Sequence, residues 1–311
     1  MRLNDDVHVL EVPVVLPGHR FPVSLTLVVD PAMGATLVDA GGPGSDEAIV
    51  GVLAGAGVRL GDLRRIVLTH QDLDHVGSLS ALARASGARV LAHEAEAPFI
   101  DGSRRPRFAE PEVLERGPEY RPVVERLRPT LVDQLLTDGE RLDLAGGVRV
   151  VSTPGHTPGH LCLYLERSRT LIAGDALLAH RGRVYGPSSE FSADLAAARR
   201  SVRRPYAHRA IPQEVERAAV IRDVVVRNAG SKGRGVFALR RFEPPTERLW
   251  RRHVAVRLWE PQLRGARHRQ LLLAERAPTT CISALCAHLY PQGVSASAGG
   301  RTNEQTYVRI T

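Results

Sequence analysis

The chain of 311 residues is long enough for about two domains and for a sizeable buried core. Apolar residues make up 43% and charged residues 24%, which is typical of globular proteins and excludes wholesale disorder and collagen-like repeats. No apolar run approaches the ~20 residues that a membrane span needs, and the N-terminus has early carboxylates but no apolar signal core. The three cysteines form no disulfide framework. We therefore expect a cytoplasmic protein with no membrane association.

The net charge of +8 is unevenly distributed along the chain. Residues 1–198 carry 20 Lys and Arg against 26 Asp and Glu, whereas residues 199–311 carry 22 against 8. We therefore predict two unlike regions, a first domain at residues 1–204 and a basic, arginine-rich region at residues 205–311. A basic tail can bind nucleic acid through phosphate contacts, but this one contains no nucleic-acid motif, so nucleic acid is the less favoured partner.

Residues 1–204 alternate strand and helix signals. Runs rich in Val and Leu predict strands at 7–15, 24–29, 36–38, 65–69, 89–92, 148–152, 161–166 and 170–173. Helices are predicted at 45–56 with Ser45 as N-cap, at 77–86, at 193–202, and as a single turn at 93–99. Residues 101–130, rich in Pro, Arg and Glu, predict a surface insertion of short helices. Strands from both ends of the region with helices between them indicate a layered α/β sandwich.

The most informative stretch is the six-residue segment His70-Gln71-Asp72-Leu73-Asp74-His75, which directly follows a predicted strand. A tight loop there can turn His70 and Asp72 toward one cation, and Asp74 and His75 toward a second. Imidazole nitrogen and carboxylate oxygen are the ligands expected for zinc, and they are also acceptable to manganese or iron. The alternative is a polar loop with N-capping aspartates, but four such side chains in six residues favour a metal site.

Two further predicted strands end in candidate ligands. His156 follows the strand at 148–152 in the turn Thr153-Pro154-Gly155-His156, and Asp175 follows the strand at 170–173. A charged residue at a buried strand end needs a partner, and a cation provides one. Each residue has an ordinary alternative, a turn histidine for His156 and a helix cap for Asp175. Together with the first cluster, they favour the metal site.

These motifs, with Leu37-Val38-Asp39-Ala40-Gly41 before them, resemble in order the metallo-β-lactamase-fold hydrolases, the superfamily that contains glyoxalase II, lactonases and β-lactamases. The resemblance covers about residues 7–200. It implies an αββα sandwich, an α/β fold, with two metal ions at one sheet edge. It also implies that Asp39 supports the ligands from behind. The implied ligands are His70, Asp72 and His156 for the first ion, Asp74 and His75 for the second, and Asp175 for both.

The chain departs from the family pattern at two places. Asp72 stands where the family usually has His, which adds negative charge that should hold the metal more tightly and make its bound water less acidic. The family also has a last metal-binding His, usually after a Gly, near position 215 of this chain. The nearest histidine is His208, with no Gly before it, and Glu214 or Glu216 could substitute. On this basis the second metal site is incomplete.

The resemblance implies a metal-dependent hydrolase that cleaves a small-molecule ester, lactone or thioester through a metal-bound hydroxide. The cofactor would be zinc, with two ions expected, and manganese or iron as alternatives. Asp74 and Asp175 would be the catalytic carboxylates, because either can orient the attacking hydroxide. His160 is expected to lie behind His156 as a structural group.

The basic region contains a second, shorter resemblance. Residues 222–243, with Ser231-Lys232-Gly233-Arg234-Gly235, resemble the opening of a SET domain, but the expected Asn-His-Ser-Cys continuation is absent. One alternative function is therefore an S-adenosylmethionine-dependent methyltransferase fragment fused to a degenerate hydrolase domain. Another is a non-catalytic, metal-stabilised binding protein. We favour a third interpretation of the tail, a coding join or frame shift beyond about residue 204.

Overall fold

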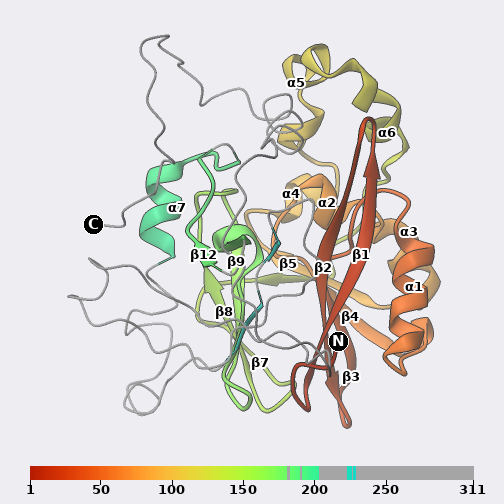
Figure 1. Ribbon diagram of the computed structural model, residues 1–311, viewed down its shortest axis with the longest axis vertical. Coiled ribbons are helices and arrows are strands. Elements are labelled where there is room, and N and C mark those ends of the chain that lie inside the picture. Colours follow the sequence, from red (N-terminus) through yellow and green to blue (C-terminus); the bar gives the residue numbers. More distant parts are fainter. Residues whose placement is uncertain (181–182, 190, 203–222, 226, 229–311) are drawn as a thin grey trace, which may run out of the picture.

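Two β-sheets packed face to face form the centre of the protein (Figure 1). The computed structural model describes residues 1–180, 183–189, 191–202, 223–225 and 227–228. Among these residues, no helix has both the length and the apolar character needed to cross a membrane.

The first sheet has six strands that follow one another in chain order. They are β1 (Val7–Leu16), β2 (His19–Asp30), β3 (Gly34–Val38), β4 (Leu63–Val67), β5 (Arg89–His93) and β6 (Gln134–Leu136). The first three strands are antiparallel, whereas β3 to β6 run parallel. Parallel neighbours need crossover connections, which here contain α1 (Asp46–Gly55), α2 (Leu73–Val76), α3 (Leu79–Ser86) and α4 (Ala97–Ile100).

The second sheet has the order β13-β10-β9-β8-β7. Its strands are β7 (Arg141–Leu142), β8 (Val148–Ser152), β9 (Leu161–Leu165), β10 (Thr170–Ile172) and β13 (Asp223–Val225). A small third sheet consists of β11 (Leu178–His180), β12 (Arg183–Tyr185) and β14 (Arg227–Asn228). The strands β13 and β14 lie beyond residue 204, yet they pair in parallel with β10 and β11.

Two apolar layers hold the sheets and helices together. Adjacent residues on the parallel strands, such as Leu37 and Val38, are both buried but belong to different clusters. One cluster packs the first sheet against α1 and α3 through Ile49 and Leu79, and the other fills the space between the sheets. A strand buried on both faces is a continuous apolar run, which explains why these strands were evident in the sequence. Each fully buried Leu or Ile contributes about 1.5–3 kcal/mol.

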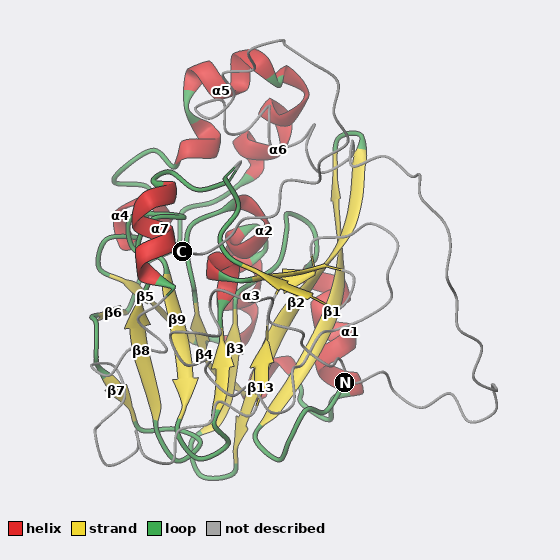
Figure 2. Ribbon diagram, turned by 60° about the vertical axis from the view of Figure 1, so that its left-hand side comes forward, coloured by secondary structure: helices red, strands yellow, loops and turns green. Residues whose placement is uncertain are grey.

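The last described helix, α7 (Leu195–Ser201), lies on the side of the second sheet away from α1 (Figure 1). The layers are therefore helix, sheet, sheet and helix, which confirms the predicted αββα sandwich. Figure 2 shows the strands of both sheets side by side, with connecting loops at both ends of the sandwich.

Most predicted elements are present, and the differences include the following three. β2 begins at His19 rather than at residue 24. Proline lacks the N–H group that strand pairing uses, but Pro22 pairs with Pro13, so both missing donors fall at one position and the pairing continues on either side. Ser45 stands at the N-cap of α1, but its hydroxyl donates to the carbonyl of Pro13 instead of capping the helix. The helical turn predicted at 93–99 begins later than expected, because His93 is the last residue of β5 and α4 begins at Ala97.

The insertion at residues 101–130 consists of short helices, as predicted, and it packs on the tip of the β1–β2 hairpin (Figure 1). Its helices are η2 (Arg107–Ala109), α5 (Pro111–Arg116), η3 (Pro118–Tyr120) and α6 (Arg121–Arg126). Tyr120 is buried, and its hydroxyl donates to the carbonyl of Pro17 in the hairpin turn at 3.3 Å. The insertion thus belongs to the same apolar cluster as α1 and α3.

Candidate metal centre

The candidate ligands meet at one edge of the sandwich because four strands end there. Asp39 follows β3, the His70 loop follows β4, His156 follows β8 and Asp175 follows β10. A backbone hydrogen bond from Leu161 to Thr69 at 3.0 Å joins the two sheets at this edge. All six predicted ligands lie in this region, and five of them are buried.

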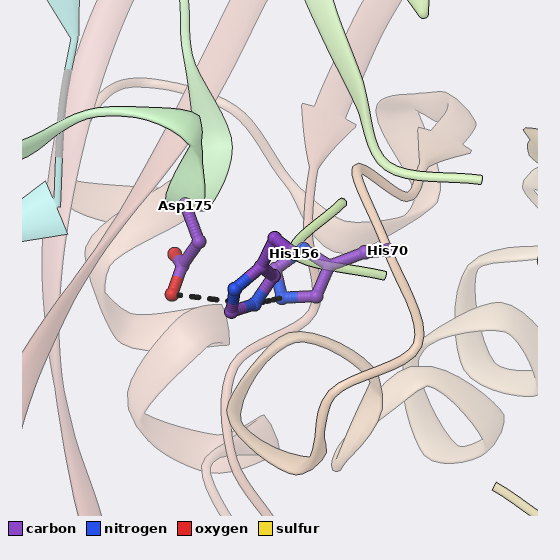
Figure 3. Close-up of side chains that lie close together, drawn as sticks. All are labelled: His70, His156 and Asp175. Carbon is purple, nitrogen blue, oxygen red and sulfur yellow. Dashed lines mark hydrogen bonds and ion pairs between the residues drawn. The ribbon is translucent and has the colours of Figure 1, made fainter. Parts of the chain in front are cut away.

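The first group of donor atoms comprises His70, Asp72 and His156. Nε2 of His156 lies 3.1 Å from Nε2 of His70 (Figure 3). The same Nε2 lies 3.1 Å from Oδ2 of Asp72. Nε2 of His70 lies 3.7 Å from the same Oδ2. Asp72 occupies the N-cap of α2, but its side chain makes no capping hydrogen bond. The carboxylate of Asp72 is therefore directed at the two imidazoles, and the alternative of N-capping aspartates does not describe it.

The second group comprises Asp74, His75 and Asp175. Nε2 of His75 lies 3.3 Å from Oδ1 of Asp175 and 4.0 Å from Oδ2 of Asp74. A small cavity borders these three side chains, and its remaining wall includes Val23 and Leu25 of β2. The second group thus encloses space that a bound ion can use.

Asp175 faces both groups at once. Its Oδ1 is directed at His75, whereas its Oδ2 lies 3.8 Å from Nε2 of His156 (Figure 3). The resemblance implies that Asp175 binds both ions, and that role stays a prediction.

Asp39 orients a histidine of each group. Its Oδ2 accepts a hydrogen bond from Nδ1 of His75 at 2.9 Å. Both of its oxygens lie 2.9 Å from the hydroxyl of Thr69, and that hydroxyl lies 2.9 Å from Nδ1 of His70. Since the Thr69 proton goes to Asp39, Nδ1–H of His70 donates to Thr69. Both histidines consequently direct Nε2 at the carboxylates.

The backbone of Asp39 adopts a strained conformation. Its φ of 64° lies in the left-handed region, which costs a non-glycine residue about 1–3 kcal/mol. The Asp39–Gly41 backbone is fixed by hydrogen bonds from Asp39 to Val67 and from Gly77 to Gly41. A side chain at Gly77 would collide with the backbone of Pro43, so glycine is required where this loop meets the 39–43 segment.

His160 lies close to His156, with ring centroids 5.7 Å apart, but its hydrogen bonds go elsewhere. Nδ1 of His160 pairs with the hydroxyl of Thr153 at 2.7 Å, and Nε2 accepts the backbone N–H of Asp175 at 3.0 Å. Burial, followed by the charge of His156, lowers the pKa of His160 to about 3. His160 is therefore neutral, and it directly fixes the backbone of Asp175 rather than the side chain of His156.

The electrostatics of the two histidines on the His70 loop are opposite. Burial, reinforced by His75 and His156, holds the pKa of His70 well below its ordinary value. Burial also disfavours charge on His75, but Asp39, Asp175 and Asp74 outweigh it and raise the pKa of His75 well above its ordinary value. Positive charge is thus favoured where the carboxylates converge.

The donor set fits divalent cations. Oxygen and nitrogen atoms of six buried or nearly buried side chains converge in two adjacent groups, and such crowding of carboxylates is costly unless positive charge lies among them. Imidazole and carboxylate are ligands of zinc, manganese and iron. His70, His156 and Asp175 each place one ligand atom within 4.8 Å of the others.

Three supporting residues were not identified from the sequence. Thr69 acts through its hydroxyl, Gly77 through its close approach to Pro43, and Glu96 through its carboxylate. The sequence gives no spacing pattern for such contacts. His208, Glu214 and Glu216, the candidates for a last ligand, lie outside the described residues.

The fold is that of the metallo-β-lactamase class, with a candidate metal centre at one edge, and comparison with known proteins agrees. The model of the metallo-beta-lactamase superfamily matches residues 19–214. The chain belongs to that superfamily, and its fold implies divalent-metal binding. At the level of the family, this confirms the predicted class, a metallo-β-lactamase-fold hydrolase.

Relatives in two bacteria and a solved structure support the assignment. The chain is 36% identical over 163 residues to the uncharacterized protein YobT of Bacillus subtilis, a match covering 52% of this chain and 65% of that relative. It is 29% identical over 189 residues to the probable metallo-hydrolase YflN of the same organism, covering 53% and 68%. It is 30% identical over 118 residues to the hydroxyacylglutathione hydrolase of Rhizobium meliloti, covering 38% and 35%. A metallo-beta-lactamase family protein from Thermus thermophilus superposes with a TM-score of 0.52 at 29% identity, covering 73% and 74%.

The predictions for the basic region have a different outcome. The family match ends at residue 214, and the resemblance of residues 222–243 to a SET domain finds no support. Except for the five residues of β13 and β14, residues 203–311 lie outside the described part of the chain. Nucleic-acid binding, which the sequence analysis gave as the less favoured use of this tail, finds no support in the comparisons.

Proposed function

We propose that the protein is a metal-dependent hydrolase of small-molecule carboxylic esters, lactones or thioesters, with two zinc ions as the cofactor. The observation that carries the proposal is the position of Asp175, whose two oxygens face His75 on one side and His156 on the other. This position suits a ligand shared by two ions. Manganese and iron suit the same donor set and are the alternatives to zinc.

The residues that would hold the metal are those of the two groups. His70, Asp72 and His156 would bind the first ion, Asp74 and His75 the second, and Asp175 both. Bound divalent cations supply Lewis acidity, which makes water easier to deprotonate near neutral pH and polarises a substrate carbonyl.

The carboxylates of Asp74 and Asp175 are proposed as the catalytic groups. Asp175 is 2% exposed and its backbone is fixed by His160, so its side chain can hold a water molecule in a constant orientation. Asp74 borders the cavity and can accept a proton from that water. Excluding bulk water from this edge strengthens every charge interaction within it.

A thioester is one substrate class worth testing, because one relative is named a hydroxyacylglutathione hydrolase. The fold alone does not select among ester, lactone and thioester. We assign the activity to residues 1–204, with β13 and β14 contributing strands from the region 205–311.

A hydrolysis assay with metal removal tests the proposal. The full chain is incubated with p-nitrophenyl acetate, a γ-lactone and S-lactoylglutathione, before and after chelation, and again after zinc is restored. We expect at least one substrate to be cleaved, with activity lost on chelation and recovered with zinc. Asp175→Asn should lower kcat about 10²–10³-fold. Asp143→Asn, a change at a carboxylate that is 92% exposed, is the control. Hydrolysis that survives complete metal removal would contradict the proposal.

A further inference from the structure

Glu96 is a buried carboxylate outside the ligand set. Its exposed fraction is 0%, and it stands directly before α4, in the connection that follows β5. Neither the motif of the His70 loop nor the turn at His156 includes it. A carboxylate is costly to bury unless its oxygens are hydrogen-bonded.

Each oxygen of Glu96 accepts a backbone N–H from a different ligand loop. Oε2 accepts from Gln71 at 2.8 Å, and Gln71 stands between His70 and Asp72. Oε1 accepts from Gly159 at 2.6 Å, three residues after His156. These two loops come from different sheets of the sandwich, so Glu96 links them across the edge where the first group of donor atoms forms.

The packing around Gly159 shows how close this link is. A Cβ at Gly159 would lie 2.8 Å from Cγ of Glu96 and 3.0 Å from Cβ of Ala95. The loop can therefore approach Glu96 only because residue 159 has no side chain. The contact leaves little freedom for either loop to shift relative to the other.

We propose that Glu96 is a positioning residue for the first metal ion, because it fixes the His70 loop against the His156 loop. The inference rests on the proposed metal binding. The 3.1 Å separation between Nε2 of His156 and Oδ2 of Asp72 spans these two loops. With Glu96 in place, these donors are set before an ion arrives, so less free energy is spent on ordering them during binding.

The chemistry of the link requires a carboxylate. Both oxygens of Glu96 act as acceptors toward N–H donors, whereas Glu96→Gln would direct an NH₂ group at one of those backbone N–H groups. One loop would then lose its hydrogen bond while the size of the side chain is unchanged. Glu94→Gln is the matched control, because Glu94 is exposed and stands only two residues away.

Cobalt(II) binding tests the inference with a readout other than activity. The full wild-type chain, Glu96→Gln and Glu94→Gln are stripped of metal and titrated with Co²⁺ against a competing chelator, and the visible spectrum is recorded at one equivalent. Glu96→Gln should bind the first Co²⁺ about 10–100-fold more weakly and with an altered spectrum, whereas Glu94→Gln should match the wild type. The melting temperature of each metal-free chain identifies any general loss of folding.

Gly159→Ala provides a second route if Glu96→Gln does not fold. The added methyl group would displace the His156 loop while leaving Glu96 intact, and the same weakening and spectral change are expected. If the wild type binds Co²⁺ and either folded variant keeps its affinity and spectrum, the positioning role is overturned and the proposed function stands. If the wild type binds no Co²⁺, the proposed function fails and the inference fails with it.

Discussion

Oδ2 of Asp39 accepts a hydrogen bond from Nδ1 of His75 across 2.9 Å, and both side chains are buried. The same carboxylate pairs with the hydroxyl of Thr69, which in turn contacts Nδ1 of His70. One acidic side chain therefore sets the orientation of a histidine in each group of donor atoms. The left-handed backbone conformation of Asp39 persists because the surrounding hydrogen bonds fix its position.

Asp39→Asn tests this relationship. The amide keeps the shape of the carboxylate but loses its charge, and its NH₂ group cannot accept from His75 or Thr69. We expect affinity for the second ion to fall about 10–100-fold, as is common for partners that orient metal-binding histidines. Competition titration with a chelator measures the change. An affinity equal to that of the wild type would show that Asp39 does not act on the metal through His75.

Asp72→His restores the residue that the family usually carries at this position. A neutral imidazole removes one negative charge beside the first ion, so the attacking water should be more acidic than in the wild type. We expect the variant to remain active and the rising limb of its pH–rate profile to move to lower pH. A profile that moves to higher pH, or does not move, would contradict the charge argument.

His160→Ala addresses the support behind Asp175. Removing the imidazole leaves the buried N–H of Asp175 without its acceptor, which costs about 1–3 kcal/mol in addition to the cavity created. His160→Gln can place an amide oxygen near the same N–H, so it should be less destabilising. Urea denaturation of the metal-free chains measures both. Equal destabilisation by the two variants would mean that volume rather than the hydrogen bond matters.

The structure also shows what the sequence could and could not predict. The candidate ligands could be identified because the motifs that contain them follow buried apolar strands, and strand ends meet at the edge of a sheet. The short strands β6, β7 and β11 were missed because two or three residues are too few to show an alternation of apolar and polar side chains. Glu96 was missed for a different reason, since its role depends on loops that are 25 and 63 residues away in the chain.

The sequence left two roles open for Asp72, helix capping and metal binding. The residue precedes a helix, so capping and metal binding were both reasonable, and only the position of Oδ2 near His156 distinguishes them. Ser45 shows the opposite case. Its position predicts a helix cap, but its hydroxyl donates a hydrogen bond to the carbonyl of Pro13 instead.

Cys162 provides a prediction about reactivity. The thiol is buried, and burial raises its pKa to about 12 despite a contact with the Thr153 hydroxyl. The thiol therefore stays protonated at pH 8, and the thiolate is the reactive form. We expect iodoacetamide to leave Cys162 unmodified in the folded chain at pH 8 and to modify it fully in denaturant, as measured by peptide mass spectrometry. Rapid modification of the folded chain would contradict the packing around it.

The most direct test of the central claim is the metal content of the purified full chain, measured by elemental analysis after exhaustive dialysis. The geometry of Asp175 between two groups of donors predicts about two divalent ions per chain, with zinc as the expected metal. Asp175→Asn should retain fewer. A single ion would contradict the shared role of Asp175, and a chain that retains no metal, even after incubation with excess zinc, would contradict the metal centre itself.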